Sequence, residues 1–211
     1  VYKDRKLTSE LLHARIQAIC LEHGASARGT IVAGGDQACD PHEEGFGPLR
    51  ANELIVVDIF PRGKDGYFGD MTRTYLKGRA SEAQQALVDT VLTAQKKAIR
   101  ALKAGVSGKA VHQLVEKFFD ARGFRTSVDK KGYSGFFHGL GHGLGIEVHE
   151  APRLSPRGGV LKEGAVVTVE PGLYYPERGF GVRVEDTVAF EEDGTLVTLT
   201  QYPYDLVIPM K

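Results

Sequence analysis

This sequence of 211 residues has no excess of positive or negative charge, since Lys and Arg together number 27 and so do Asp and Glu. A basic excess is typical of proteins that bind nucleic acid or an anionic membrane surface, so neither partner is expected. No apolar run approaches the roughly 20 residues that a membrane-spanning helix requires. The opening residues Val1 to Lys6 contain no apolar core of a signal peptide. These absences together predict a cytoplasmic protein.

Cysteine is scarce as well, with two residues, Cys20 and Cys39, that form no metal or redox motif. We interpret them as a thiol on a helix face and a thiol in a loop. The hydrophobic content of 42% and aromatic content of 9% are typical of a globular protein, and the length allows a sizeable core. We therefore expect a single domain over residues 1–211.

The most unusual stretch runs from His138 to Glu150 and reads HGLGHGLGIEVHE. It places His138, His142 and His149 between glycines, which disfavour a helix and allow the backbone to approach a bound group closely. A single histidine in such a loop is more often an ordinary polar residue. Three of the chain's seven histidines together predict one wall of an active site.

Hydrophobic periodicity and capping signals predict three helices. These helices cover residues 8–23, 81–104 and 107–122. The second begins with a capping box, because Gln84 lies three residues after Ser81. Apolar runs and turn residues predict strands over residues 30–33, 54–60, 67–75, 165–171 and 181–186.

The predicted elements repeat in order, a helix followed by a strand hairpin with one acid on each arm. Asp58 and Asp70 belong to the first hairpin, and Glu170 and Glu185 to the second, in which residues 181–186 are expected to pair with residues 165–171. The fold class predicted from this order is α+β, with two similar halves of antiparallel strands covered by helices.

Acids within apolar strands need a partner, because an unpaired buried carboxylate is costly. Arg73 and Arg183 could supply it for one or two of them. Four acids and His142 nevertheless fit better around metal, and oxygen ligands with one imidazole suit manganese, iron, cobalt or zinc. Five ligands exceed what one catalytic zinc uses. Two divalent ions fit the number, and such a pair can activate water and polarise a carbonyl.

These residues, in this order, resemble the ligands of the dinuclear metallopeptidases of the pita-bread fold, which include methionine aminopeptidase, aminopeptidase P and prolidase. The resemblance covers nearly the whole chain. It implies that Asp58 holds one ion, that His142 and Glu170 hold the other, and that Asp70 and Glu185 bridge both. Manganese is the metal that we expect first, with cobalt, zinc or iron as alternatives.

Further motifs resemble the proline-directed branch of that family. They are Asp-Met-Thr-Arg-Thr at 70–74, His138 four residues before the ligand histidine, Glu-Pro-Gly-Leu-Tyr at 170–174 and Gly-Val-Arg-Val-Glu at 181–185. The resemblance implies that Glu170 also transfers a proton and that His149, His42 and His138 are catalytic. It places the substrate against His138, His149, Tyr174 and Arg183. The implied function is hydrolysis of the bond between an N-terminal residue and proline in a small peptide.

Two alternatives remain open. Methionine aminopeptidase is favoured by the length but not by His138 or by Thr72 to Thr74. A catalytically inactive protein-binding module of the same fold would usually have lost metal ligands, and all five are present.

The sequence departs from the family pattern in two places. Asp58 and Asp70 are one residue further apart than usual, which makes Asp65 a rival ligand. We also expect this chain to be the catalytic domain only, without the N-terminal domain that is usual in the proline-directed branch, and whether an upstream segment is needed for activity stays open. The metal, the choice between dipeptides and longer peptides, and a homodimer as the assembly stay open.

Overall fold

The structure is a computed structural model that describes residues 6–130 and 132–209. Residues 1–5, which belong to the N-terminal stretch without a signal-peptide core, lie outside the described residues. Within the described ranges, no helix is long and apolar enough to cross a membrane.

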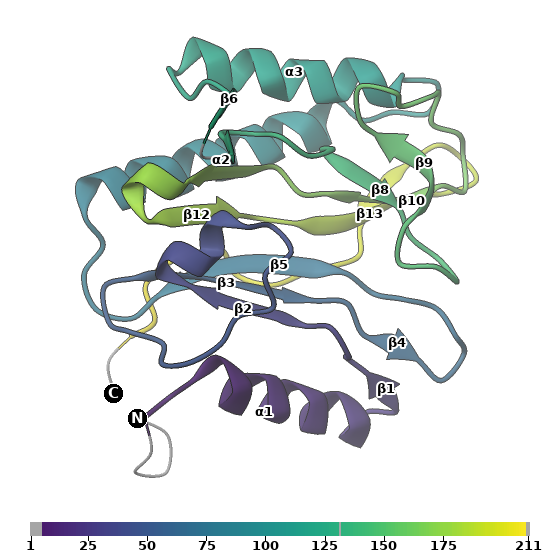
Figure 1. The fold of residues 1–211 in the computed structure, drawn as a ribbon. Helices are drawn as coiled ribbons and strands as arrows, with labels where there is room; N and C mark the ends of the chain where they lie inside the picture. The colour runs from purple at the N-terminus through teal and green to yellow at the C-terminus, as the bar shows by residue number, and fades with distance from the viewer. Residues whose placement is uncertain (1–5, 131, 210–211) are drawn as a thin grey trace.

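Helices cover both outer faces of a layer of antiparallel strands (Figure 1). Helix α1 (Ser9–Glu22) lies on one face, while α2 (Glu82–Ala101) and α3 (Gly108–Ala121) pack side by side on the other. Two short 3-10 helices, η1 (Gly35–Cys39) and η2 (Pro176–Arg178), connect strands. This arrangement confirms the α+β class with antiparallel strands covered by helices.

The described strands form two larger sheets and three pairs. The first larger sheet has the order β2-β3-β5, made of β2 (Ile31–Gly34), β3 (Leu54–Ile59) and β5 (Met71–Leu76). The second has the order β14-β13-β10-β8-β9, made of β8 (Gly141–Gly143), β9 (Glu150–Leu154), β10 (Val166–Val169), β13 (Asp186–Phe190) and β14 (Leu196–Thr198). The pairs are β1 (Ala25–Ser26) with β4 (Arg62–Gly63), β6 (Ser127–Asp129) with β7 (Gly132–Ser134), and β11 (Gly172–Tyr175) with β12 (Phe180–Arg183).

The capping box of α2 is confirmed. The Ser81 hydroxyl accepts a hydrogen bond from the Gln84 backbone N–H, and the Gln84 side chain accepts one from the Ser81 N–H. The helix ends three residues before the predicted position, because Leu102 already has an extended backbone at φ −71° and ψ 131°. Its inner face buries Leu87, Val91, Ala94 and Ala98 against the sheet.

The first acidic hairpin is also confirmed. Strands β3 and β5 are antiparallel, with Asp58 opposite Thr72, and Asp70 lies directly before β5. Strand β3 is buried from Leu54 to Asp58, as its apolar run predicts. The returning strand begins later than predicted, because the Phe68 N–H donates instead to the Gly145 carbonyl and the Gly69 N–H to the Pro61 carbonyl, both at 2.9 Å.

The predicted pairing of residues 181–186 with residues 165–171 is wrong in its register. Strand β12 pairs with β11, and β10 pairs with β13, so that Val169 faces Asp186. Pro171 has no N–H and interrupts the ladder between the two pairings. The hairpin therefore consists of two successive ladders, and both acids lie at the junction between them.

The junction directs the backbone of each acid toward another strand. The Glu170 N–H donates to the Leu140 carbonyl at 2.8 Å, and the Glu185 N–H donates to the Thr72 carbonyl at 3.0 Å. The second bond joins the two halves of the chain.

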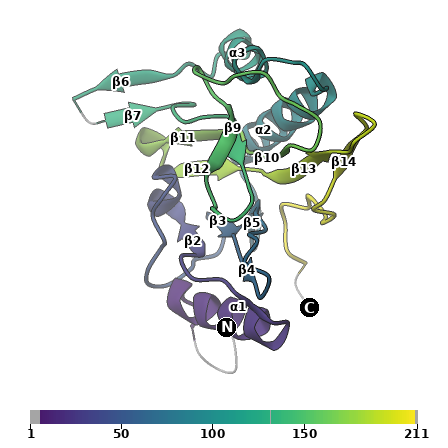
Figure 2. The same ribbon diagram turned by 90° about the vertical axis from the view of Figure 1, so that its right-hand side faces the viewer.

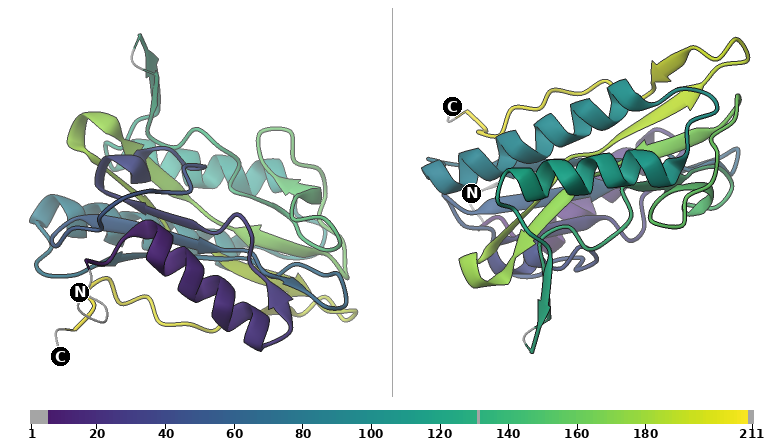
Figure 3. Two further views of the ribbon diagram at one scale, coloured as in Figure 1. Left: turned by 60° about the horizontal axis from the view of Figure 1, so that its bottom comes forward. Right: turned by 90° about the horizontal axis from the view of Figure 1, so that it is seen from above.

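The β6–β7 hairpin and the segment after β14 lie outside the two larger sheets. The β6–β7 hairpin projects away from the body, as two views at right angles show (Figure 2 and Figure 3). The segment after β14 returns to the first half, where the Leu76 N–H donates to the Leu206 carbonyl at 2.8 Å. Both halves of the chain therefore contact each other at strands and at the C-terminal segment.

Candidate active site

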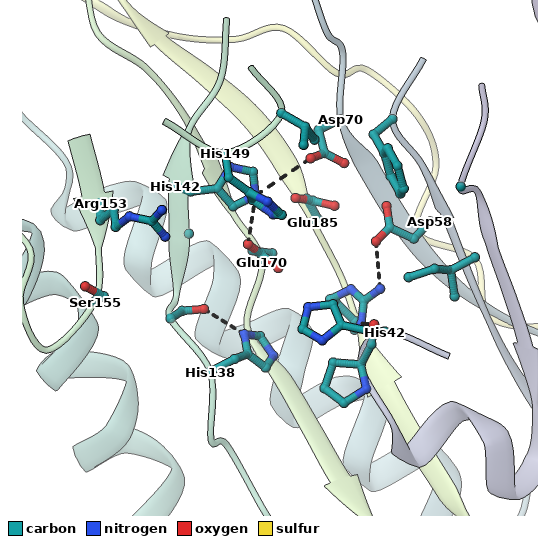
Figure 4. Close-up of a pocket in the computed structure, with 18 of the residues that line it drawn as sticks. His42, Asp58, Asp70, His138, His142, His149, Arg153, Ser155, Glu170 and Glu185 are labelled. Carbon is teal, nitrogen blue, oxygen red and sulfur yellow. Dashed lines mark hydrogen bonds and ion pairs between the residues drawn. The ribbon is translucent and has the colours of Figure 1, made fainter. Parts of the chain in front are cut away.

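A cavity of about 530 Å³ is lined by residues from both halves of the chain (Figure 4). Its lining includes all five predicted metal ligands, Asp58, Asp70, His142, Glu170 and Glu185, and also His42, His138, His149 and Arg183. Tyr174 is fully buried behind the lining residues, and its hydroxyl forms a hydrogen bond with His138. Asp65 lies outside this cavity, exposed in a turn where it accepts a hydrogen bond from the Tyr67 N–H.

The predicted ligands lie within reach of one another. His142 Nε2 is 3.3 Å from Glu170 Oε1 and 3.8 Å from Asp70 Oδ2. Ligand atoms of Asp70, His142 and Glu185 all lie within 4.8 Å of one another. Asp58 faces the same group from β3 (Figure 4). Residues that are far apart in the sequence thus form one compact cluster of donor atoms.

The glycines on either side of His142 allow β8 to pass closely between its neighbours. A Cβ on Gly141 would lie 2.0 Å from the Thr168 carbonyl oxygen, and a Cβ on Gly143 would lie 2.3 Å from that of Ala151. No side chain fits at either position. The close approach brings the His142 N–H to the Thr168 hydroxyl, which accepts it at 3.1 Å. The glycines at 141 and 143 therefore allow the close strand packing that positions His142.

Hydroxyl groups orient two of the carboxylates. The Thr72 hydroxyl donates to Glu185 Oε2 at 2.7 Å, and the Thr168 hydroxyl donates to Glu170 Oε1 at 3.3 Å. His142 Nδ1 lies 3.1 Å from the Gly143 carbonyl, so we assign a proton to Nδ1. Nε2 is then the nitrogen that faces the acids and is available as a metal ligand.

Arginine satisfies the acids only in part. Arg183 pairs with Asp58 Oδ2 at 2.7 Å, as the ion-pair alternative anticipated. Arg73 instead pairs with Asp186 at 2.8 Å, outside the four predicted acids. Among the described residues, Oδ1 of Asp58 and Oδ1 of Asp70 are buried without a hydrogen-bond partner. Buried carboxylate oxygens in this state are costly, and a cation would satisfy them.

The electrostatics of the cluster also fit a cation. Burial, followed by the charges of Asp58 and Glu170, raises the pKa of Asp70 well above its usual value. Burial and the charge of Asp70 do the same to the pKa of Glu185. Burial lowers the pKa of His142, but the hydrogen bond and charge of Glu170 outweigh it and raise that pKa overall. Ionisation of Asp70 and Glu185 is therefore disfavoured in the absence of a nearby cation.

His138 is a neutral acceptor in this arrangement. Burial lowers its pKa to about 4. Its Nδ1 lies 2.7 Å from the Gly139 carbonyl, so Nε2 accepts a hydrogen bond from the Tyr174 hydroxyl at 3.0 Å. Arg183 in turn donates to that hydroxyl at 3.0 Å. Both ring nitrogens are engaged, which makes His138 a fixed wall of the cavity.

Two histidines line the more open part of the cavity. The ring of His149 lies edge to face against His142, with 4.3 Å between centroids. Burial and the neighbouring charge of His142 lower the pKa of His149. His42 lies on the same side of the cavity as Asp58 (Figure 4). These exposed rings are placed to reach a bound molecule.

Residues 3–192 match the model of metallopeptidase family M24. The chain belongs to that family. It is 37% identical over 186 residues to the Xaa-Pro dipeptidase of Pyrococcus furiosus, a match that covers 86% of this chain and 50% of that protein.

Solved structures agree with this membership. The prolidase of Pyrococcus horikoshii has a TM-score of 0.87 and 32% identity, covering 97% of this chain and 57% of that one. The X-Pro aminopeptidase of Thermotoga maritima has a TM-score of 0.85 and 33% identity, covering 96% and 55%. These likenesses confirm the pita-bread fold. The chain spans about half the length of the curated relatives that it matches.

The M24 chain also places a residue at its cavity that sequence reasoning missed. Arg153 on β9 lies beside His142 in the strand register and lines the cavity, and Ser155 follows it there (Figure 4). Within the described ranges, no carboxylate lies within ion-pair distance of the Arg153 guanidinium. Only the pairing of β8 with β9 could have revealed this position, since no motif contains it.

Proposed function

We propose that this M24 chain is the catalytic part of a dinuclear-metal-dependent exopeptidase that hydrolyses the bond between an N-terminal residue and proline. The observation that carries this proposal is the convergence of Asp58, Asp70, His142, Glu170 and Glu185 on one cavity. Two buried carboxylate oxygens in it have no hydrogen-bond partner within the described part of the chain. The substrate is a small peptide, because the cavity of about 530 Å³ accommodates only a few residues.

The proposed ligand assignment follows the resemblance of the motifs. Asp58 would hold one ion, His142 and Glu170 the other, and Asp70 and Glu185 both. Manganese is the first expectation, with cobalt, zinc and iron as alternatives of compatible chemistry. When bound, the two ions supply an activated water and polarise the scissile carbonyl.

Protein side chains would carry out proton transfer, oxyanion binding and substrate positioning. Burial would raise the pKa of Glu170, but the hydrogen bond of His142 and nearby positive charges lower it to about 2, so its carboxylate is ionised and available to hold metal. The resemblance of its motif is what supports the further role of Glu170 in proton transfer. His149 and His42 would donate hydrogen bonds to the developing oxyanion or orient the peptide. His138, Tyr174 and Arg183 form the rigid wall that positions the substrate.

The two alternatives are less favoured. The three similar proteins described above are named for cleavage at proline and not for removal of methionine. An inactive binding module would not require five converging ligands. A cytoplasmic location, a homodimer and a single catalytic domain over residues 1–211 stay predictions.

Hydrolysis of three peptides tests the function. We expect the metal-stripped protein to be inactive, and added Mn²⁺, Co²⁺ or Zn²⁺ to restore cleavage of Ala-Pro or Ala-Pro-Ala but not of Met-Ala-Ser. Release of free alanine measures the reaction. Cleavage of Met-Ala-Ser alone would assign the methionine branch, and no turnover despite two bound ions would contradict the proposed activity for this chain.

Arg153 supports a preference for dipeptides. The Arg153 guanidinium lines the cavity and has no ion-pair partner among the described residues, so it fits the C-terminal carboxylate of a bound dipeptide, which arginine can hold with two hydrogen bonds. A longer peptide would present an uncharged amide at that place. We therefore propose that Arg153 selects substrates by the position of their carboxylate.

Replacing Arg153 by Met should lower kcat/KM for Ala-Pro by about 10- to 100-fold, since hydrogen bonds to charged groups contribute about 1.5–3 kcal/mol. Hydrolysis of Ala-Pro amide, which lacks the carboxylate, should change little. Arg157→Met provides the matched control, because Arg157 is exposed and lies outside the cavity lining. An equal decrease in kcat/KM for both substrates would show that Arg153 does not bind the carboxylate.

A further inference from the structure

Arg73 lies on the opposite face of β5 from the candidate metal site. Thr72 points its hydroxyl at Glu185, and because side chains alternate along a strand, Arg73 points away from the cavity. Its side chain is nevertheless almost completely buried, with a relative exposure of 2%. A buried arginine of this kind must find partners for every N–H group.

All five N–H groups of the Arg73 guanidinium have acceptors nearby. Nη1 donates to the backbone carbonyls of Thr72 and Glu185. Nη2 donates to Asp186 Oδ1 at 2.8 Å and to the Tyr202 carbonyl at 3.0 Å, and Nε donates to the Pro203 carbonyl at 3.1 Å. One planar group thereby joins β5, the Glu185–Asp186 segment and the C-terminal segment.

Asp186 is held by the same C-terminal segment. It accepts hydrogen bonds from the Thr200 hydroxyl at 2.7 Å and from the Tyr204 hydroxyl at 2.6 Å, and also from Gln95 on α2. The Tyr204 ring lies against the Arg73 guanidinium, 4.4 Å from its carbon to the ring centroid. The C-terminal residues therefore complete the surroundings of both members of the ion pair.

Stability alone does not explain this network. A buried ion pair seldom stabilises a fold more than apolar side chains of similar volume would, because both charges must be desolvated. What this one does is fix the backbone at Thr72 and Glu185, the two residues whose side chains meet at 2.7 Å in the site. The orientation of a ligand carboxylate is worth about 10- to 100-fold in metal affinity.

We propose that Arg73 is a positioning residue and that it forms, with Asp186 and the C-terminal residues 200–204, a clamp that orients Glu185 for metal binding. This inference rests on the proposed function only in taking Glu185 as a metal ligand. The clamp predicts that residues 200–204 affect metal binding although they do not line the cavity.

Calorimetric titration of the metal-free protein with Co²⁺ tests the clamp. Arg73→Lys keeps the charge but loses the planar array of donors, and we expect at least about tenfold weaker Co²⁺ binding. Tyr204→Phe keeps the ring and removes one hydrogen bond to Asp186, for an expected loss of about three- to tenfold. The cobalt absorption spectrum, measured at saturation, should report altered ligand geometry in both variants.

Two controls separate the clamp from general stability. Ser81→Ala removes the cap of α2 away from the site, so it should lower the melting temperature without changing Co²⁺ affinity. Tyr67→Phe alters an exposed tyrosine and should change neither. Unchanged affinity in both Arg73→Lys and Tyr204→Phe, with normal binding by the unaltered protein, would overturn the clamp alone. Failure of the unaltered protein to bind Co²⁺ would overturn the proposed metal site as well.

Discussion

Replacing His142 or Glu185 by Ala should abolish metal loading and lower kcat/KM for Ala-Pro by at least about 10³-fold. Metal ions contribute several kcal/mol to stabilising the transition state, and each 1.36 kcal/mol corresponds to a factor of ten. His142 supplies the imidazole that faces Glu170 and Asp70, and Glu185 lies with them in the same cluster. Elemental analysis of bound metal, together with steady-state hydrolysis, measures both losses.

The matched control is His23→Ala, which removes an exposed histidine from the C-terminal end of α1. Its metal content and kcat/KM should equal those of the unaltered protein. Full hydrolysis by His142→Ala or Glu185→Ala protein in metal-free buffer would exclude the proposed chemistry. Retained metal with lost hydrolysis would instead assign these two side chains to a step after metal binding.

Replacing Arg183 by Met should destabilise the metal-free protein by about 3–5 kcal/mol, because it leaves the Asp58 carboxylate buried without its partner. The guanidinium also donates to the Pro41 carbonyl at 3.1 Å and to the Thr72 hydroxyl at 3.2 Å, so the substitution breaks contacts between the two halves of the chain. The free energy of unfolding, obtained from urea denaturation in the presence of a chelator, measures the effect.

A double-mutant cycle with Asp58→Asn separates the ion pair from the other contacts. If the loss arises from an uncompensated charge, Asp58→Asn should recover a large part of the stability lost by Arg183→Met. Added Co²⁺ should also stabilise Arg183→Met, since a cation near Asp58 replaces the missing charge. Additive losses in the double variant would show that Arg183 stabilises the fold through its contacts with Pro41, Thr72 and Tyr174 instead.

The sequence by itself determined the features that depend on residues close together in the chain. The capping box at Ser81 follows from a spacing of three residues. The hairpin that carries Asp58 and Asp70 follows from two strands joined by a connection without a helix, which leaves antiparallel pairing as the simple arrangement. The five candidate ligands were identified from the resemblance of their motifs, and the cavity brings all five together.

Only the tertiary structure decided which distant groups meet. Arg183 and Asp58 are 125 positions apart, and Thr72 and Glu185 are 113 apart, so no local pattern links them. Tertiary packing also sets three other features: the strand register around Pro171, the pairing of Arg73 with Asp186, and the position of Arg153 at the cavity. Each depends on how two strands or halves pack, because burial leaves a charged group with only those partners that the completed fold brings to it.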